Sequence, residues 1–484
     1  MSISKKVILL MLVVLVATLS VSAVSFSAKK PVPLTVCLPS SSWGGSNDPG
    51  LMEEVKKYIE QKTNTTIKAI SPPLNTYSDK INVLLASGDI PDVFRINKAM
   101  VNVHTFTVRG YTAALDKYIK KNKAFKDIEP KHFNYMRVNG SIRALPKGQE
   151  SEKVIWMRKD LLDQYGVKLS STPTTEEFYN EMKKVKDRIP LTFPKFLDNL
   201  PFFYHSFGVY DEFIKDKKGK YYDVFNTEDM RECLRYVNRL YRDGVLDKEF
   251  PTNDNSVLRN NLISGKATAN IDYDIRYFYY MSEIARVDPT AKPDLKPIFK
   301  LIGPKGFGGT LNEACTDAEG ISSKSKYPEA AVNLVAWMNY TAEGIKGTRL
   351  GIPGKHYTIE NGIGKLTPLA ESGGQAFELT NLMKLHQPIE KLGLGFKFPN
   401  EENSQVYYNL TKDINKHTGR KEVISLGQSV IYDRVGPALI KKRQEVALKI
   451  IIGTVSIADG YKEYDNFFKS INGEQLLKEL NSKK

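Results

Sequence analysis

Residues 84–94, LLASGDIPDVF, bring two carboxylates and a glycine together where the local structure changes. The apolar start is typical of the end of a helix, the Ser-Gly-Asp that follows interrupts it, and the proline leads into an apolar run typical of a strand. Ionised carboxylates accept hydrogen bonds, so Asp89 and Asp92 could bind the hydroxyl groups of a ligand. Aspartates are also common in turns and at helix caps, so a purely structural role stays open.

A second candidate for ligand binding is the loop SSSWGG at residues 40–45. It follows an apolar strand and precedes an amphipathic helix, which is the position at which α/β sheets bind ligands. An aromatic ring such as that of Trp43 is costly to expose in a glycine-rich loop unless it covers something. The loop is therefore interpreted either as a ligand contact or as an ordinary flexible connection.

Motifs for covalent or metal-dependent catalysis are missing from the sequence. The six histidines form no HxxxH or HExxH pattern, and neither a GxSxG elbow nor a GxxxxGK[ST] phosphate loop occurs. Calcium loops need regularly spaced oxygen ligands, which DKKGKYYD and TNDNS do not supply. We therefore predict no catalytic residue, no metal and no cofactor. A pair of distant carboxylates, as in glycosidases, stays open as a catalytic arrangement.

The N-terminus predicts export. Lys5 and Lys6 precede an uncharged apolar run, and small residues follow with plausible cleavage sites at Ala23 or Ser27. Residues 1–28 are therefore expected to be a signal peptide, although the 22 uncharged residues that begin at Val7 could instead stay in the chain as a membrane anchor. The expected location is extracellular, at the cell surface or in the periplasm.

The net charge of +15 would suit an acidic partner, but basic and acidic residues are interleaved along the chain, so a solvated surface accounts for the charge. Because the chain is also predicted to be exported, nucleic acid is not expected as a partner. The three cysteines, Cys37, Cys233 and Cys315, are scattered, allow at most one disulfide and form no metal-binding cluster. Buried thiols are expected.

With 484 residues, the chain is expected to form at least two lobes. Apolar strand-like runs at 33–38, 66–70 and 91–94 alternate with helical patterns at 51–64 and 77–86. This alternation predicts the α/β class, with a mostly parallel sheet covered by helices on both faces. A threonine-capped helix is expected to begin in TPTTEEF, and the chain from GQSVIYDRV to its end is mostly helical in pattern.

Several segments, taken in order, resemble one family, the extracellular solute-binding proteins of ABC importers in the carbohydrate-uptake group. LLASGDIPDVF is similar to the ASGD-x-PD segment of that family, and GYTAALDKYIKK, GSIRALPKG and VIWMRKDLLDQYGV match the landmarks that follow it. TPTTEEFYNEMKKVKD, SGKATANIDY and SSKSKYPEAAVNLVAWMNYTAEG match later ones, and GIPGKHY with YRDGVLDKEF is most similar to the long Gram-positive oligosaccharide-binding lipoproteins. The chain differs in one respect, because no lipid-attachment cysteine follows the predicted signal.

The resemblance implies a type II periplasmic-binding-protein fold, in which two α/β lobes are joined by a hinge and enclose a ligand cleft. The first crossing between the lobes is expected near Pro146 and the return near Pro304. The segments assigned in this way are lobe 1 at residues 33–146 and 305–365, and lobe 2 at residues 147–304 with a helical C-terminal part at 366–484.

The same resemblance implies that the protein captures a sugar or oligosaccharide and delivers it to the permease subunits of an ABC transporter as a non-enzymatic monomer. Sugars offer hydroxyls to planar polar groups and a C–H face to aromatic rings. Asp89 and Asp92 would lie at the cleft end of a strand, and the expected ligand-binding residues are Trp43, Asp89, Asp92, Trp156, Arg158, Tyr204, Tyr273, Arg276, His356 and Tyr357. The alternatives are a peptide or other small-solute binding protein, an extracellular glycosidase, and a surface adhesion or sensor-associated protein.

Overall fold

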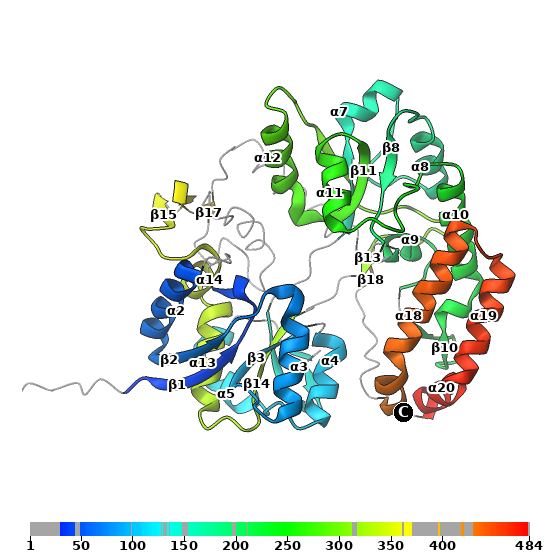
Figure 1. Ribbon diagram of the computed structural model, residues 1–484. Helices are drawn as coiled ribbons and strands as arrows, with labels where there is room; N and C mark the ends of the chain where they lie inside the picture. The colour runs from blue at the N-terminus through cyan, green and yellow to red at the C-terminus, as the bar shows by residue number, and fades with distance from the viewer. Residues whose placement is uncertain are drawn as a thin grey trace, which may run out of the picture.

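The protein is described by a computed structural model with two α/β lobes (Figure 1). The predicted signal at 1–28, Cys315 and most of the predicted segment 366–428 lie outside the described residues. The residues that the structure describes are 30–43, 49–97, 99–126, 128, 133–134, 136–147, 153–195, 200–210, 212–311, 317–360, 363–369, 395–396, 418–420 and 429–482.

Lobe 1 is built on a five-stranded sheet in the order β2-β1-β3-β14-β6. The first three strands along the chain are parallel, as the β-α alternation predicts, and β14 runs antiparallel to both of its neighbours. The strands are β1 (Val32–Cys37), β2 (Thr65–Ile70), β3 (Val93–Ile96), β6 (Ala144–Pro146) and β14 (Ala318–Ile321).

Helices cover both faces of the lobe 1 sheet (Figure 1). One side carries α2 (Pro49–Thr63), α13 (Pro328–Tyr340) and α14 (Ala342–Leu350), which pack on one another, and the other carries α3 (Tyr77–Ser87) and α4 (Ala99–Val108). One continuous apolar core joins these layers. The shorter elements are η1 (Ser40–Ser42), η2 (Leu74–Thr76), α5 (Asp116–Lys121), η3 (Lys123–Phe125), β4 (Arg137–Val138) and β5 (Ser141–Ile142).

Lobe 2 is built on a four-stranded sheet in the order β12-β7-β11-β8. Strand β7 is antiparallel to β11 and β12, whereas β8 is parallel to β11, so β8, β11 and β12 all point the same way. The strands are β7 (Lys153–Arg158), β8 (Ile189–Thr192), β11 (Ala267–Tyr273) and β12 (Leu295–Ile298).

The lobe 2 helices include one with the N-terminal cap that the sequence predicts. Thr174 and Glu177 form a capping box, because the Thr174 side chain accepts from the Glu177 N–H at 3.1 Å and the Glu177 carboxylate accepts from the Thr174 N–H at 2.7 Å. The elements are α7 (Lys159–Leu162), η4 (Asp163–Tyr165), α8 (Thr175–Met182), α9 (Pro201–Ser206), β9 (Phe213–Lys215), β10 (Tyr221–Asp223), η5 (Val224–Asn226), α10 (Glu228–Arg242), α11 (Asn255–Ile263), η6 (Asp274–Arg276) and α12 (Tyr277–Val287).

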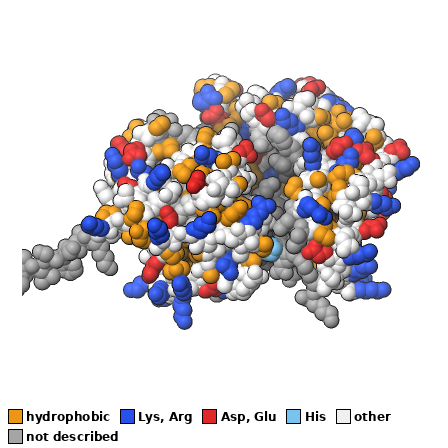
Figure 2. Space-filling model, turned by 60° about the horizontal axis from the view of Figure 1, so that its bottom comes forward, with side chains coloured by type: hydrophobic (Ala, Val, Ile, Leu, Met, Phe, Trp, Pro, Cys, Tyr) orange, Lys and Arg blue, Asp and Glu red, His pale blue; other side chains and the backbone are white. Residues whose placement is uncertain are grey.

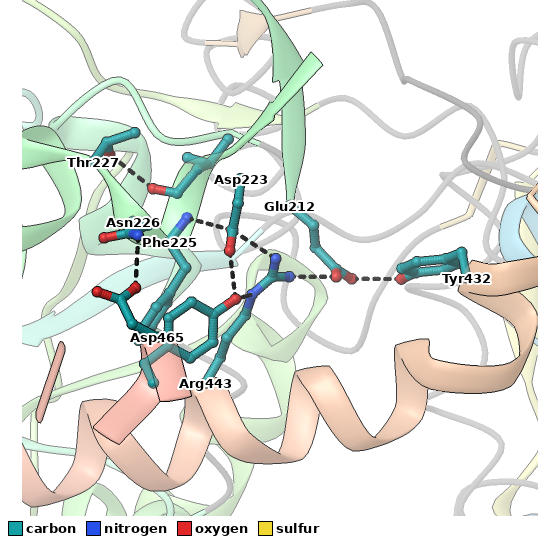
Figure 3. Close-up of polar contacts among 10 residues, drawn as sticks. Glu212, Asp223, Phe225, Asn226, Thr227, Tyr432, Arg443 and Asp465 are labelled. Carbon is teal, nitrogen blue, oxygen red and sulfur yellow. Dashed lines mark hydrogen bonds and ion pairs between the residues drawn. The ribbon is translucent and has the colours of Figure 1, made fainter. Parts of the chain in front are cut away.

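Three C-terminal helices, α18 (Val430–Ile452), α19 (Ile457–Ser470) and α20 (Gly473–Ser482), pack on the lobe 2 core. A buried charge network fixes them to the β9–β10 hairpin (Figure 3). The Arg443 guanidinium donates to Asp223 at 2.7 Å and to Glu212 at 2.5 Å, and Glu212 also accepts from Tyr432 at 2.9 Å. Tyr464 donates to Asp223 at 2.5 Å, so the network ties α18 and α19 to the hairpin.

Short strands complete the described structure. They are β13 (Thr310–Leu311), which pairs with β18 (Thr418–Arg420), and a three-stranded sheet of β15 (Tyr357–Glu360), β16 (Ile363–Leu366) and β17 (Gly395–Phe396). Among the described helices, none combines the length and the apolar character that crossing a membrane requires.

The chain leaves lobe 1 and returns to it at neighbouring positions. The Lys147 N–H donates to the Asp317 carbonyl oxygen at 2.8 Å, which extends the pairing of β6 with β14 by one bond. The first crossing therefore follows Lys147, next to the expected Pro146.

The return crossing lies later than the expected Pro304. Tyr210 donates to the carbonyl oxygen of Gly308 at 3.2 Å, and a Cβ at Gly303 would lie 1.6 Å from the carbonyl oxygen of Ser206. The glycines of this segment allow residues 303–311 to pack closely on lobe 2. Lobe 1 resumes at Asp317, so the predicted boundary at 305 is corrected.

Candidate functional site

The candidate ligand site is the pair of sheet edges next to the crossings. In lobe 1, β1, β2 and β3 end at the edge where Lys147 leaves. In lobe 2, β7 begins at Lys153 beside Tyr273, the last residue of β11. Open α/β sheets bind ligands beyond the carboxyl ends of their strands. Figure 2 shows the two lobes side by side, with basic and acidic side chains spread over both. The two edges would line the space between the lobes.

Trp43 lies at the edge of the lobe 1 sheet where the parallel strands end, but its ring is not exposed to solvent. It is 1% exposed and belongs to the lobe 1 core. The loop turns back onto the sheet because the Ser40 N–H donates to the carbonyl oxygen of Pro72 at 3.0 Å, and the Trp43 N–H donates to that of Ser40 at 3.2 Å. The expectation of an exposed ring that waits for a ligand is therefore corrected for this conformation.

A buried ion pair joins the two central strands at the same edge. Arg95 of β3 donates to Glu319 of β14 at 3.2 Å and to the Ser42 hydroxyl at 3.0 Å, and Asn339 donates to the second Glu319 oxygen at 3.0 Å. Burial opposes the charge of Arg95, but the carboxylates of Glu319 and Asp317 outweigh that effect and raise its pKa. Nothing in the local sequence around Arg95 suggests this partner, which lies 224 residues away.

Several buried polar atoms at the lobe 1 edge have no hydrogen-bond partner among the described residues. Buried polar groups are nearly always paired, so a group of unpaired ones at one edge needs an explanation. A ligand with hydroxyl or carboxylate groups can pair with both donors and acceptors. The atoms are Trp43 Nε1, Ser71 Oγ, Arg95 Nε and Asn97 Oδ1.

In lobe 2 the carboxyl end of β11 carries a second polar network. The Asp272 carboxylate accepts from Arg259 at 2.8 Å, from the Tyr280 hydroxyl at 2.7 Å and from the Tyr273 N–H at 2.8 Å. Asn270 donates to the Tyr280 hydroxyl at 2.7 Å, and its Oδ1 atom has no partner in the described part of the chain. These contacts hold the end of β11 rigidly, which suits a surface that orients a ligand.

Tyr273 and Arg276 are the predicted residues that the structure places at the lobe 2 edge. Both are half-buried, Tyr273 at the end of β11 and Arg276 in η6 directly after it. Burial and the charge of Arg259 lower the pKa of Arg276. Tyr204 is also half-buried, on α9, and packs against the main core of lobe 2.

Arg158 does not lie at the edge that faces the crossings, and Trp156, which pairs with Asn270 of β11, is buried. Trp156 is 1% exposed in an apolar core and donates to the carbonyl oxygen of Tyr273 at 3.1 Å. Arg158 ends β7, so it lies at the opposite edge from Lys153 and donates to Asp160 at 2.6 Å. The expected cleft position of Arg158 is corrected, because β7 begins and does not end at the crossing, and the ligand contact of Trp156 stays a prediction.

Asp89 and Asp92 lie at the amino end of β3, which is opposite to the expected cleft end. The Asp92 carboxylate accepts from the Thr35 N–H at 2.8 Å and from the Ser325 hydroxyl at 2.5 Å. Gly88 ends α3 with φ +84°, a left-handed conformation that favours glycine. Asp89 is exposed. The segment 84–94 therefore ends a helix and fixes the start of a strand. The expected placement of these aspartates at the cleft end is corrected, and their binding of ligand stays a prediction.

His356 and Tyr357 are both buried in lobe 1. His356 is 3% exposed and its Nδ1 atom accepts from the Ile352 N–H at 2.9 Å, so the imidazole closes its own loop. Burial, followed by the charge of Lys355, lowers the pKa of His356. The adjacent ion pair of Lys355 with Glu54, at 2.6 Å, fastens this loop to α2. Both residues are buried in this conformation, and their contact with a ligand stays a prediction.

Comparison with known proteins identifies the family. The model for bacterial extracellular solute-binding proteins matches residues 44–343, so the chain belongs to this family. Lipoprotein LipO of Bacillus subtilis strain 168 is 22% identical over 464 residues, which cover 88% of this chain and 87% of LipO. The polygalacturonan/rhamnogalacturonan-binding protein YtcQ of the same strain is 23% identical over 449 residues, with 87% and 86% covered.

Solved structures confirm the expected fold. The alginate-binding protein AlgQ2 superposes with a TM-score of 0.68 at 17% identity, covering 93% of this chain and 97% of AlgQ2. The sugar-binding protein MalE of Xanthomonas citri superposes with a TM-score of 0.62 at 15% identity, covering 92% and 98%. The chain therefore has the type II periplasmic-binding-protein fold that the sequence motifs imply. Within the described residues no cluster of His, Cys, Asp and Glu side chains could hold a metal ion.

Proposed function

We propose that this protein captures an oligosaccharide outside the cytoplasm and delivers it to the permease subunits of an ABC transporter. The observation that carries the proposal is the pair of polar sheet edges on either side of adjacent chain crossings. Relatives support a saccharide ligand, since YtcQ is a polygalacturonan/rhamnogalacturonan-binding protein and FusA of Streptococcus pneumoniae, 24% identical over 204 residues, is a fructooligosaccharide substrate-binding protein.

The ligand would be held between the lobes by both edges. Tyr273 can stack on a sugar face, and the amide groups of Asn97 and Asn270 can pair with hydroxyls. The two crossings are bonded to each other at Lys147 and Asp317, so one lobe would rotate against the other about this connection. Ligand binding would stabilise the closed form, which the permease distinguishes from the open one.

The protein would act as a monomer and return its ligand chemically unchanged. An affinity near micromolar, about −8 kcal/mol, allows both capture and release. Export would place it at the cell surface or in the periplasm. Of the expected contacts, Tyr204, Tyr273 and Arg276 remain part of the proposed site.

A thermal-shift screen of neutral and acidic oligosaccharides, with peptides as the comparison set, tests the proposal. Ligand at 100 times its dissociation constant adds about 2.7 kcal/mol to native-state stability, which raises the melting temperature by several degrees. Each hit is then incubated with the protein and recovered for mass spectrometry. Stabilisation by peptides alone would refute saccharide capture, and recovery of shortened sugars would indicate a glycosidase.

A further inference from the structure

Lys147 occupies a fixed position at the carboxyl edge of lobe 1. Its N–H donates to the Asp317 carbonyl oxygen at 2.8 Å, and the hydroxyl of Tyr340 donates to the carbonyl oxygen of the preceding Pro146. The peptide group that precedes Lys147 is therefore held through both its N–H and its carbonyl oxygen. Its side chain lies at the point where the first crossing leaves the sheet, which is also the edge that binds ligands in folds of this kind.

The charges around Lys147 do not balance. Among the described residues, the charges of Arg95 in β3 and Arg349 in α14 oppose the protonation of Lys147, whereas the carboxylates of Asp317 and of Glu319 in β14 favour it. With Lys147 included, these described residues carry three positive and two negative charges. Within the described chain no carboxylate oxygen lies within 4.0 Å of the Lys147 ammonium, although other ion pairs of the molecule satisfy that limit.

The nearest buried carboxylate already has partners on both oxygens. Glu319 accepts from Arg95 at 3.2 Å through one oxygen and from Asn339 at 3.0 Å through the other. Both Arg95 Nε and the neighbouring Trp43 Nε1 are buried donors without a partner among the described residues. Among the described residues, this edge of lobe 1 therefore combines more positive than negative charge with two buried N–H donors that an anionic acceptor could satisfy.

We propose that Lys147 binds a carboxylate group of the ligand, so that the solute is an acidic oligosaccharide built of uronic-acid residues. The inference rests on the proposed capture of a saccharide and narrows it to one class. Lysine presents a compact charge with three donors, which suits a single carboxylate at the edge of a cleft. The positive charges of Arg95 and Arg349 near Lys147 would strengthen the attraction of the ligand carboxylate.

The state of Lys147 makes the binding depend on pH. Burial, together with the charges of Arg95 and Arg349, lowers the pKa of Lys147 to about 7 in the free protein. A bound carboxylate favours the ammonium form, so the ligand binds to the protonated fraction. That fraction falls roughly tenfold between pH 6 and pH 8, and the affinity for an acidic ligand falls with it by about tenfold.

The test is titration calorimetry with short oligomers of galacturonate, mannuronate and glucuronate, with the methyl esters of each as uncharged counterparts. Wild-type protein is expected to bind at least one acid about tenfold or more tightly than its ester at pH 6, and to lose that preference at pH 8. Lys147→Gln should remove the preference and Lys147→Arg should retain part of it. Lys120→Gln, an exposed lysine of the same lobe, is the matched control.

The outcomes separate this inference from the proposed function. If neutral oligosaccharides bind but all three acids do not, or if Lys147→Gln keeps the acid preference, the inference is overturned while saccharide capture stands. If no saccharide binds, both fail. Should Lys147→Gln not fold, the comparison of acid with ester in the wild type at the two pH values decides, and equal affinities overturn the inference.

Discussion

The N–H of Lys147 donates to the carbonyl oxygen of Asp317 at 2.8 Å, so the first departure of the chain from lobe 1 and its return lie side by side. Two crossings that lie side by side form a narrow connection, about which one lobe can turn without disturbing either core. The same connection marks the sheet edge from which a ligand would be bound. Residues at this edge of each sheet should therefore affect ligand binding, and residues at the opposite edge should not.

Two arginines of lobe 2 test this dependence on the edge. Arg276→Gln should weaken saccharide binding about tenfold, or about 1.4 kcal/mol, because Arg276 lies in η6 after the carboxyl end of β11. Arg158→Gln should leave the affinity unchanged, since Arg158 ends β7 at the opposite edge. Calorimetry on both variants measures the difference. Equal losses in the two variants would contradict the assignment of the site.

Asp92 is expected to contribute to stability and not to binding. Asp92→Ala removes the acceptor of the Thr35 N–H and of the Ser325 hydroxyl, which should lower the free energy of unfolding by about 1–3 kcal/mol. Asp89→Ala, a change at an exposed neighbour, should stay within about 0.5 kcal/mol of the wild type. Urea unfolding gives the stabilities. A loss of ligand affinity in Asp92→Ala at unchanged stability would restore the original binding interpretation.

The C-terminal helices should depend on one buried arginine. Arg443→Met leaves the Asp223 and Glu212 carboxylates without their cation and should destabilise lobe 2 by about 3–5 kcal/mol. Arg235→Met breaks an exposed pair with Glu228 and should change the stability by less than about 1 kcal/mol. Thermal unfolding measures both. Similar melting temperatures for the two variants would show that the buried network does not hold the helices in place.

The burial of His205 should make the folded protein less stable in acid. Burial lowers its pKa to about 4, whereas the unfolded chain takes up the proton near pH 6.5. The unfolded state therefore binds more protons as the pH falls through 6.5, and stability is lost from there down to about pH 4. Between pH 7 and 4.5 this amounts to about 2–3 kcal/mol.

His205→Gln is the variant that isolates this contribution. It should be less stable than the wild type at pH 7, where the Nδ1 contact with the carbonyl oxygen of Gly309 at 3.0 Å is lost, and should change less on acidification. Urea unfolding at pH 7 and 4.5 gives the two slopes. Identical pH dependence in the variant and the wild type would assign the acid sensitivity to other groups.

The local and ordered features of the sequence predict much of the fold. The alternation of strands and helices up to Phe94, the capping box at Thr174 and the order of the family motifs all correspond to the structure. Each of these features depends on the spacing of residues within a short segment or on a match to a known pattern. Neither kind of evidence depends on contacts with distant parts of the chain.

The candidate site is harder to predict, because it depends on which strand end meets which edge. The sequence places Asp92 near the start of a strand at 91–94, but it does not say which edge of the sheet faces the ligand. Arg158 has the correct chemistry, yet β7 runs opposite to its neighbours and carries it away from the crossing. The pairing of Arg95 with Glu319 joins strands 224 residues apart, which no local pattern reveals.

Because the Arg443 network fixes α18 and α19 to the β9–β10 hairpin, the C-terminal helices must move with lobe 2 as one rigid body when the lobes rotate against each other. A fluorescent label at exposed Gln475 of α20 would therefore report the position of lobe 2, and one at exposed Lys57 of α2 that of lobe 1. Energy transfer between these dyes would report the opening angle of single molecules in real time, with no label near the sugar.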